Sequence, residues 1–438
     1  MGAGLTGDPL AAPLALPCGA VLPNRLAKAA MTEGLADAHG RATDRLAHLY
    51  RRWSEGGAGL LVTGNVQIDR FVLERPGNVV LDSRWPPSVD ATARARLAAW
   101  ARAGTVGGNH LWMQISHAGR QSPRYVTREP LAPSAVPLRL MGNYARPRAL
   151  RDDEIVALIG RFADAAAMAR DSGFTGVQLH AAHGYLISSF LSPVTNRRTD
   201  AWGGPLEHRA RLLLETVRAV RRAVGDDYPV GVKLNSDDFR QGGFSHDECL
   251  RVVEWLGDTG IDLLEVSGGT YEQPRLLGAA GRAGDAVEVR PSTRVREAYF
   301  LHYATAIRQV ARMPLMVTGG FRTRAGMEAA LAGGDTDVIG LGRPLCTDPD
   351  APRRLLAREM DALPDHEQRL HLAARGRLSP ASPWLLAKMV NVLGAQGWYY
   401  RQIEHLADGE PPDTGLGLLP AFGGYVAREL HRAARLRR

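Results

Sequence analysis

Two histidines and a tyrosine follow a short apolar stretch in the middle of the chain. The residues Gly-Val-Gln-Leu at 176–179 are β-prone and predict a buried strand, and His180, His183 and Tyr185 come at its carboxyl end. Imidazoles can donate hydrogen bonds to a carbonyl oxygen or an anion, and a phenol can give up a proton. In a parallel barrel these side chains would lie on the face that holds the chemistry. Taken alone, the pattern is equally typical of loop residues bonded to backbone.

Eight apolar, non-alternating stretches recur along the chain, and helix-like segments fill seven of the intervals. The expected strands are 25–31, 59–64, 111–116, 176–179, 229–234, 262–266, 314–318 and 337–341. The expected helices are 44–53, 88–103, 152–171, 206–224, 245–259, 299–312 and 323–332. This order predicts an α/β fold, a (β/α)₈ TIM barrel. An open doubly wound sheet is the second choice, and the lack of a GxGxxG motif after an early strand counts against it.

The chain divides into two parts on this interpretation. Residues 1–350 form the barrel, and residues 351–438 form a C-terminal helical extension packed on the barrel or on a neighbouring subunit. The extension carries aromatic anchors at Trp384, Trp398, Tyr399 and Tyr400. A homo-oligomer is therefore an open alternative.

Small residues and an arginine end the last three expected strands. They are Ser267-Gly268, Gly319-Gly320 and Gly342-Arg343. Glycines let backbone N–H groups approach an anion, and an arginine can contact phosphate with two hydrogen bonds. The general phosphate site of such barrels lies at strands seven and eight. We therefore expect a phosphate-bearing ligand at this side of the barrel.

The remaining strand ends suit a flat heterocycle. Gln114 offers an amide that can donate and accept, Lys233 offers a cation, and Met31-Thr32 and Asn65 follow strands one and two. Together with a phosphate site, this combination favours FMN over a sugar phosphate. The alternative for each residue is structural: Gln114 as a buried hydrogen-bonding group, and Lys233 as an ion-pair partner of Asp237 or Asp238.

Composition excludes several other classes of function. The net charge is +8 and the pI about 9.7, but the cations are almost all scattered arginines, so nucleic-acid binding is not expected. No run of about 18 apolar residues and no signal peptide occur, so neither a membrane span nor secretion is expected. Cys18, Cys249 and Cys346 lie far apart. We expect no disulfide framework, no metal site and a reducing cytoplasm.

Longer motifs give the chain a specific resemblance. These are Pro23-Asn24-Arg25; Gln114-Ile-Ser-His117-Ala-Gly-Arg120-Gln121; His180-x-x-His183-Gly-Tyr185-Leu-x-x-x-Phe190-Leu191-Ser192-Pro193; and Asn196-Arg197-Arg198-Thr199-Asp200-x-Trp202-Gly203-Gly204. Over about residues 15–350 the chain resembles the Old Yellow Enzyme family of FMN-dependent ene-reductases. The fold of that family is the predicted barrel.

The resemblance implies a role for each matching residue. His180 and His183 would bind the substrate carbonyl, and Tyr185 would donate the proton. FMN would be held by residues from seven strand ends, namely Ala30, Met31, Thr32, Asn65, Gln114, Lys233, Ser267, Gly268, Gly319, Gly320, Gly342 and Arg343. The family often has arginine where this chain has Lys233. NAD(P)H would reduce the flavin, and hydride would then pass to the β-carbon of an α,β-unsaturated carbonyl compound by a ping-pong mechanism.

Other activities of FMN barrels remain as alternatives. The same site could run in reverse, as a dehydrogenase or desaturase, or serve a redox sensor. FMN-dependent RNA reductases use a cysteine acid, and only Cys346 approaches a fitting position, so this function is disfavoured. Iron–sulfur relatives are disfavoured because no cysteine follows Cys346. We expect loops 118–150 and 270–290 to set substrate choice, whereas NADH or NADPH preference stays open.

Overall fold

Eight parallel strands close into a barrel in the computed structural model, which describes residues 7–140, 142–267 and 301–436. The strands are β3 (Leu26–Lys28), β4 (Leu60–Val62), β6 (His110–Ser116), β9 (Gly176–Ala181), β10 (Val230–Asn235), β11 (Leu263–Ser267), β12 (Leu315–Thr318) and β13 (Val338–Leu341). Their order is β4-β3-β13-β12-β11-β10-β9-β6, and pairing of β4 with β6 closes the ring. The short strand β5 (Val66–Gln67) adds to β6. The predicted (β/α)₈ TIM barrel is confirmed.

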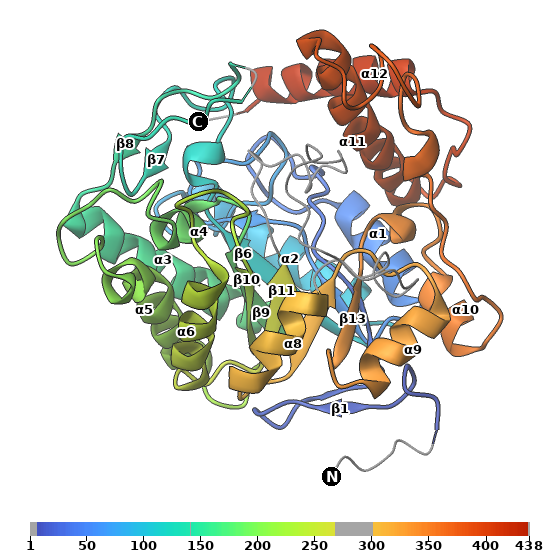
Figure 1. Cartoon of the computed structure of the whole chain (residues 1–438), viewed down its shortest axis with the longest axis horizontal. Coiled ribbons are helices and arrows are strands. Elements are labelled where there is room, and N and C mark those ends of the chain that lie inside the picture. Colours follow the sequence, from blue (N-terminus) through green and yellow to red (C-terminus); the bar gives the residue numbers. More distant parts are fainter. Residues whose placement is uncertain (1–6, 141, 268–300, 437–438) are drawn as a thin grey trace.

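Helices lie outside the barrel between successive strands (Figure 1). They are α1 (Asp44–Ser54), α2 (Ala91–Ala103), α3 (Asp152–Asp171), α5 (Leu206–Val224), α6 (His246–Gly257), α8 (Leu301–Val310) and α9 (Arg324–Ala332). A capping box begins α6, where the Ser245 hydroxyl accepts from the Glu248 N–H and the Glu248 side chain accepts from the Ser245 N–H. The expected start of the second helix was too early, since Asp90 caps α2 by accepting from Ala93 N–H. An extra short helix, α4 (Leu186–Leu191), follows β9 directly.

The amino-terminal half of the barrel interior is apolar. Leu60, Val62, Trp112, Leu263 and Met316 form a buried cluster there with the hairpin strands β1 (Leu14–Ala15) and β2 (Val21–Leu22). Figure 1 shows β1 below the barrel, where the hairpin covers that end. The large indole explains two glycines. A Cβ atom on Gly176 would lie 2.4 Å from Nε1 of Trp112, and one on Gly231 would lie 2.9 Å from the same ring. Any chemistry must therefore occupy the carboxyl half.

Two long helices of the C-terminal region pack beside and above that carboxyl end (Figure 1). α11 (Leu385–Ala407) lies against α12 (Leu418–Ala434) and also contacts α1 and the segment η4 (Arg343–Cys346). The helix α10 (Ala351–Leu356) precedes them. A buried ion pair joins Arg75, from the connection after β5, to Glu429 of α12. Among the described residues, no helix is both long and apolar enough to cross a membrane.

Candidate active site at the carboxyl end of the barrel

A row of polar side chains crosses the barrel interior just above the apolar cluster. Nε2 of Gln114 donates to Oε1 of Gln178 at 2.6 Å, and Nε2 of Gln178 donates to Oε2 of Glu265 at 2.8 Å. Nζ of Lys233 lies 2.7 Å from Oε1 of Glu265. Because β10 separates β9 from β11, the bond between Gln178 and Glu265 shows that both side chains point inward. The structure thus brings Gln114 and Lys233 into one network.

The sequence suggested Asp237 or Asp238 as an ion-pair partner of Lys233, and this was wrong. Lys233 points into the barrel and pairs with Glu265, which is its register neighbour on β11. Asp238 instead accepts from Nδ2 of Asn235 and from the N–H of Phe244, each at 3.1 Å. The carboxylate lies after the end of β10, where it organises the following turn.

His180 and His183 meet above this row and bond to each other. Nε2 of His180 lies 3.2 Å from Nδ1 of His183. Nδ1 of His180 lies 2.7 Å from Oδ1 of Asn65, and Nε2 of His183 lies 2.7 Å from Oγ of Ser267. Residues from β9, β11 and the end of β4 therefore converge, as the sequence predicted for the strand ends.

The backbone around the histidines is held in an uncommon conformation. His183 has a φ of +63°, and its N–H donates to Oδ1 of Asn235 at 3.0 Å. Burial lowers the pKa of His180 well below its usual value, and the neighbouring His183 and the Lys233 cation lower it further. Burial, followed by the Lys233 cation, has the same effect on the pKa of His183. Both rings are therefore neutral at physiological pH.

Tyr185 completes the group at the entrance to α4. Its ring centroid lies 4.6 Å from that of His180, and only 1% of the residue is exposed. The loop after β6 also reaches this point, because Nε2 of Gln121 donates to the carbonyl of His183 at 2.9 Å. Loop 118–150, which we expect to set substrate choice, thus contacts the site at its start. Loop 270–290 and Gly268 lie outside the described residues.

The accessible rim of the barrel mouth is formed by the ends of β3, β12 and β13. Ala30, Met31, Thr32, Gly319 and Gly342 are each partly exposed, whereas the polar row beneath them is buried. A Cβ atom on Gly342 would meet only Sδ of Met31, at 3.8 Å, so there is room above this backbone.

Glycines and an arginine border the rim on its β12 and β13 sides. Gly319 and Gly320 have φ values of +109° and +85°, which glycine adopts without strain. Nε of Arg343 lies 2.9 Å from Oε1 of Glu367, and the Arg343 side chain is 47% exposed. Peptide N–H groups, a guanidinium, an amide and a lysine are the donors that a phosphate-bearing flat ring requires. This donor set fits FMN.

A second buried cluster supports the rim from below. Nζ of Lys28 donates to the Tyr50 hydroxyl at 3.1 Å and to the Val62 carbonyl at 2.8 Å. The Tyr50 hydroxyl also bonds Glu33, which accepts from the Gly64 N–H at 2.9 Å. Burial lowers the pKa of Lys28 to about 8. This cluster ties the end of β3 to the end of β4.

Cys346 lies beneath the rim, 3.6 Å from Sδ of Met31. The thiol is buried, and burial raises its pKa to about 12. The thiol therefore stays protonated at neutral pH and packs beneath the rim against Met31.

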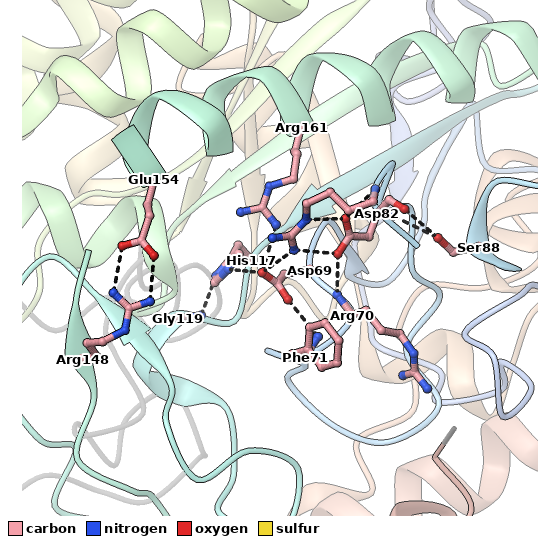
Figure 2. Close-up of polar contacts among 11 residues, drawn as sticks. Asp69, Arg70, Phe71, Asp82, Ser88, His117, Gly119, Arg148, Glu154 and Arg161 are labelled. Carbon is pink, nitrogen blue, oxygen red and sulfur yellow. Dashed lines mark hydrogen bonds and ion pairs between the residues drawn. The ribbon is translucent and has the colours of Figure 1, made fainter. Parts of the chain in front are cut away.

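The motif residue His117 belongs to a buried network beside the site (Figure 2). Nδ1 of His117 accepts from the Gly119 N–H at 3.0 Å, so Nε2 faces Oδ2 of Asp69, 3.9 Å away. Asp69 also pairs with Arg161 of α3 at 2.9 Å and with Arg84 at 3.0 Å. Burial alone would raise the pKa of Asp69, but His117 and Arg161 hold it well below its usual range. The network fastens the ends of β5 and β6 to α3.

Sequence reasoning missed three site residues: Gln178, Glu265 and Glu74. Glu265 left a signal, because a carboxylate inside the apolar strand at 262–266 calls for a buried partner. Gln178 likewise points inward, from β9. Glu74 lies in a connection where nothing distinguishes it, yet it accepts from Thr32 and Asn65.

Comparison with known proteins places the chain among flavin oxidoreductases. Residues 9–361 match the NADH:flavin oxidoreductase / NADH oxidase family. The NADH-dependent flavin oxidoreductase iliE of Hypocrea jecorina (strain QM6a) is 35% identical over 395 residues, which cover 86% of this chain and 94% of that protein. The protein of the same name from Neonectria sp. (strain DH2) is 38% identical over 358 residues, or 78% of this chain. The match spans 46% of that longer relative.

A solved structure shows the same barrel. The old yellow enzyme homologue from Zymomonas mobilis superimposes with a TM-score of 0.66 at 28% identity, covering 81% of this chain and 94% of that chain. Family match, fold and donor set agree. The chain therefore belongs to the NADH:flavin oxidoreductase / NADH oxidase family, as a member of the Old Yellow Enzyme group whose cofactor is FMN and whose reductant is NAD(P)H.

Proposed function

We propose that the protein reduces the C=C bond of an α,β-unsaturated carbonyl compound at the expense of NAD(P)H. The observation that carries this proposal is the grouping of His180, His183 and Tyr185 at the end of β9. The three side chains are packed together beside the partly exposed rim that suits FMN. A bound FMN supplies the redox chemistry, taking hydride from NAD(P)H and delivering it to the β-carbon.

The chain's own residues would polarise the substrate and supply the proton. A hydrogen bond from the histidine pair to the carbonyl oxygen stabilises the negative charge that develops there, as an oxyanion hole does. Both rings are neutral, so they act as hydrogen-bonding groups rather than as proton donors. Tyr185 would protonate the α-carbon, since a phenolic O–H is acidic enough to give its proton to an enolate.

The proposal makes a direct prediction for the two half-reactions. Purified protein loaded with FMN is reduced anaerobically with NADH or NADPH, and 2-cyclohexenone is then added. We expect the oxidised flavin spectrum to return and cyclohexanone to form. Cyclohexanone serves as the matched control, because it carries the same carbonyl without the C=C bond. A reduced flavin that stays reduced across a panel of enones would reject the proposal.

The reverse direction is tested with the same protein. Saturated ketones are supplied to the oxidised enzyme together with an artificial electron acceptor. Faster turnover in this direction than in enone reduction would favour the dehydrogenase or desaturase alternative.

A further inference from the structure

The histidine pair is part of a hydrogen-bond chain that starts at a carboxylate. Oε2 of Glu74 accepts from Nδ2 of Asn65 at 2.7 Å and from Oγ1 of Thr32 at 2.8 Å. Oδ1 of Asn65 then faces Nδ1 of His180 at 2.7 Å. From His180 the chain continues to His183 and ends at Ser267.

The chemistry of the groups gives this chain a single direction. An ionised carboxylate only accepts hydrogen bonds, so the amide nitrogen of Asn65 must face Glu74 and the amide oxygen must face His180. That oxygen also only accepts, so Nδ1 of His180 carries the hydrogen. In a neutral imidazole the other nitrogen is then an acceptor.

The tautomer of His183 follows from that of His180. Because Nε2 of His180 accepts, the hydrogen between the two rings belongs to Nδ1 of His183. Nε2 of His183 therefore accepts, and the hydroxyl of Ser267 donates to it. Each contact is 2.7 to 3.2 Å long, within hydrogen-bonding range.

We propose that Glu74 is a positioning residue that sets, through Asn65, the tautomers of His180 and His183. The two facing nitrogens then present one acceptor, Nε2 of His180, and one donor, Nδ1–H of His183. A substrate carbonyl that approaches the pair takes its hydrogen bond from Nδ1–H of His183 in place of Nε2 of His180, which as an acceptor offers the oxygen none. Before the carbonyl binds, His180 holds that donor in place. This inference rests on the proposed function only for its catalytic meaning, since the tautomers themselves are a property of the protein.

Glu74 could instead have a purely structural role, which the choice of variants must distinguish from control of the tautomers. Glu74 ties the end of β3 to the end of β4 through Thr32 and Asn65, so its loss could simply loosen the rim. Thr32→Val separates the two roles. It removes one of the bonds that anchor Glu74 but keeps the carboxylate that faces Asn65.

Nitrogen NMR of the FMN-loaded protein reads the tautomers directly. The protein is labelled with ¹⁵N-histidine, and the signals of the pair are assigned with the variants His180→Gln and His183→Gln. In the wild type we expect Nδ1–H on both rings. Glu74→Gln allows the Asn65 amide to turn over, because a glutamine at this position can donate as well as accept. His180 should then move toward the Nε2–H form.

Three further variants complete the test. Glu74→Asp keeps the charge and should restore the wild-type pattern at least in part. Thr32→Val and the distant, exposed Glu254→Gln should leave both tautomers unchanged. An Nε2–H on His180 in the wild type would overturn the inference without any variant. Unchanged tautomers in Glu74→Gln, or a shift in Thr32→Val equal to that in Glu74→Gln, would overturn it too.

The outcome is separable from that of the proposed function. If both rings carry Nδ1–H but enones do not reoxidise the reduced flavin, only the proposed reductase activity is rejected. Enone reduction with different tautomers would remove only the role of Glu74.

Discussion

Nζ of Lys233 lies 2.7 Å from Oε1 of Glu265, and both side chains are buried in the barrel interior. The two residues are register neighbours on β10 and β11. The only described cation in the polar row thus has a carboxylate beside it, and that carboxylate is itself bonded to Gln178. If Lys233 faces the pyrimidine edge of FMN, its charge there is partly offset by Glu265.

Replacing Glu265 with glutamine should therefore raise the midpoint potential of bound FMN. The variant keeps an acceptor for Gln178 but removes the negative charge, so the Lys233 cation stabilises the reduced, anionic flavin more strongly. We expect a rise of some tens of millivolts, since about 30 mV corresponds to roughly 1.4 kcal/mol for a two-electron couple. Anaerobic titration against dyes of known potential measures the change.

Glu254→Gln is the matched control for this measurement, because it removes the same charge from the exposed face of α6. Its potential should equal that of the wild type. A Glu265→Gln potential that is unchanged or lower would show that Lys233 does not act on the flavin.

Tyr185→Phe should separate the two half-reactions. Loss of the phenol removes the proposed proton donor but leaves the site for NAD(P)H, so enone-driven reoxidation should slow by about 10²- to 10⁴-fold. Reduction of the flavin by NAD(P)H should change little. Stopped-flow absorbance of the flavin follows each step separately.

Tyr228→Phe provides the control for a lost buried hydroxyl. The Tyr228 hydroxyl donates to the carbonyl of Phe174 at 2.8 Å, beside the amino end of β9 and away from the site. Neither half-reaction should respond to this change. Equal losses in both half-reactions of Tyr185→Phe would contradict the role given to Tyr185.

The barrel could be predicted because its signals are local. Strands buried on both faces are continuously apolar, and the helices between them carry their own caps, as Ser245 and Thr323 show. Strand ends were less accurate. β3 ends at Lys28 rather than at residue 31, because the chain leaves the sheet there to form the rim.

The site could be predicted only where the residue type or a motif in the sequence indicates a function. His180, His183 and Tyr185 follow a strand and match a long motif, whereas Glu74 is one glutamate among many in a connection. The pairing of Lys233 with Glu265 depends on the register between β10 and β11, which no local pattern fixes. The contact between Arg75 and Glu429 joins residues 354 positions apart, and only the folded chain reveals it.

Glu429→Ala should destabilise the protein strongly. Glu429 and Arg75 are almost fully buried, and the Arg75 guanidinium also lies 3.8 Å from the ring centroid of Tyr400. Removing the carboxylate leaves a buried cation without its partner, which typically costs about 3–5 kcal/mol of unfolding free energy. Chemical denaturation with and without FMN measures the loss.

Glu410→Ala is the control for the ion pair of Glu429. Glu410 pairs with His405 at the exposed end of α11, with 58% of its side chain accessible. Exposed pairs contribute about 0–1 kcal/mol, so this variant should be nearly neutral. Similar losses in the two variants would mean that the contact between Arg75 and Glu429 does not hold α12 over the barrel.

Asp69 should make the unfolding free energy depend on acid pH. Its pKa is depressed in the folded state by His117 and Arg161, whereas an unfolded Asp has a pKa near 4. A depressed pKa contributes stability that is fully present above about pH 4 and is lost as the pH falls toward the folded-state pKa.

Asp69→Asn should therefore be less stable than the wild type at neutral pH, by about 3–5 kcal/mol for a broken buried pair. The gap should narrow below about pH 4. Denaturation curves from pH 7 down to the acid limit test this, with the exposed Asp226→Asn as control, and a gap of constant size would contradict the assigned charge of Asp69.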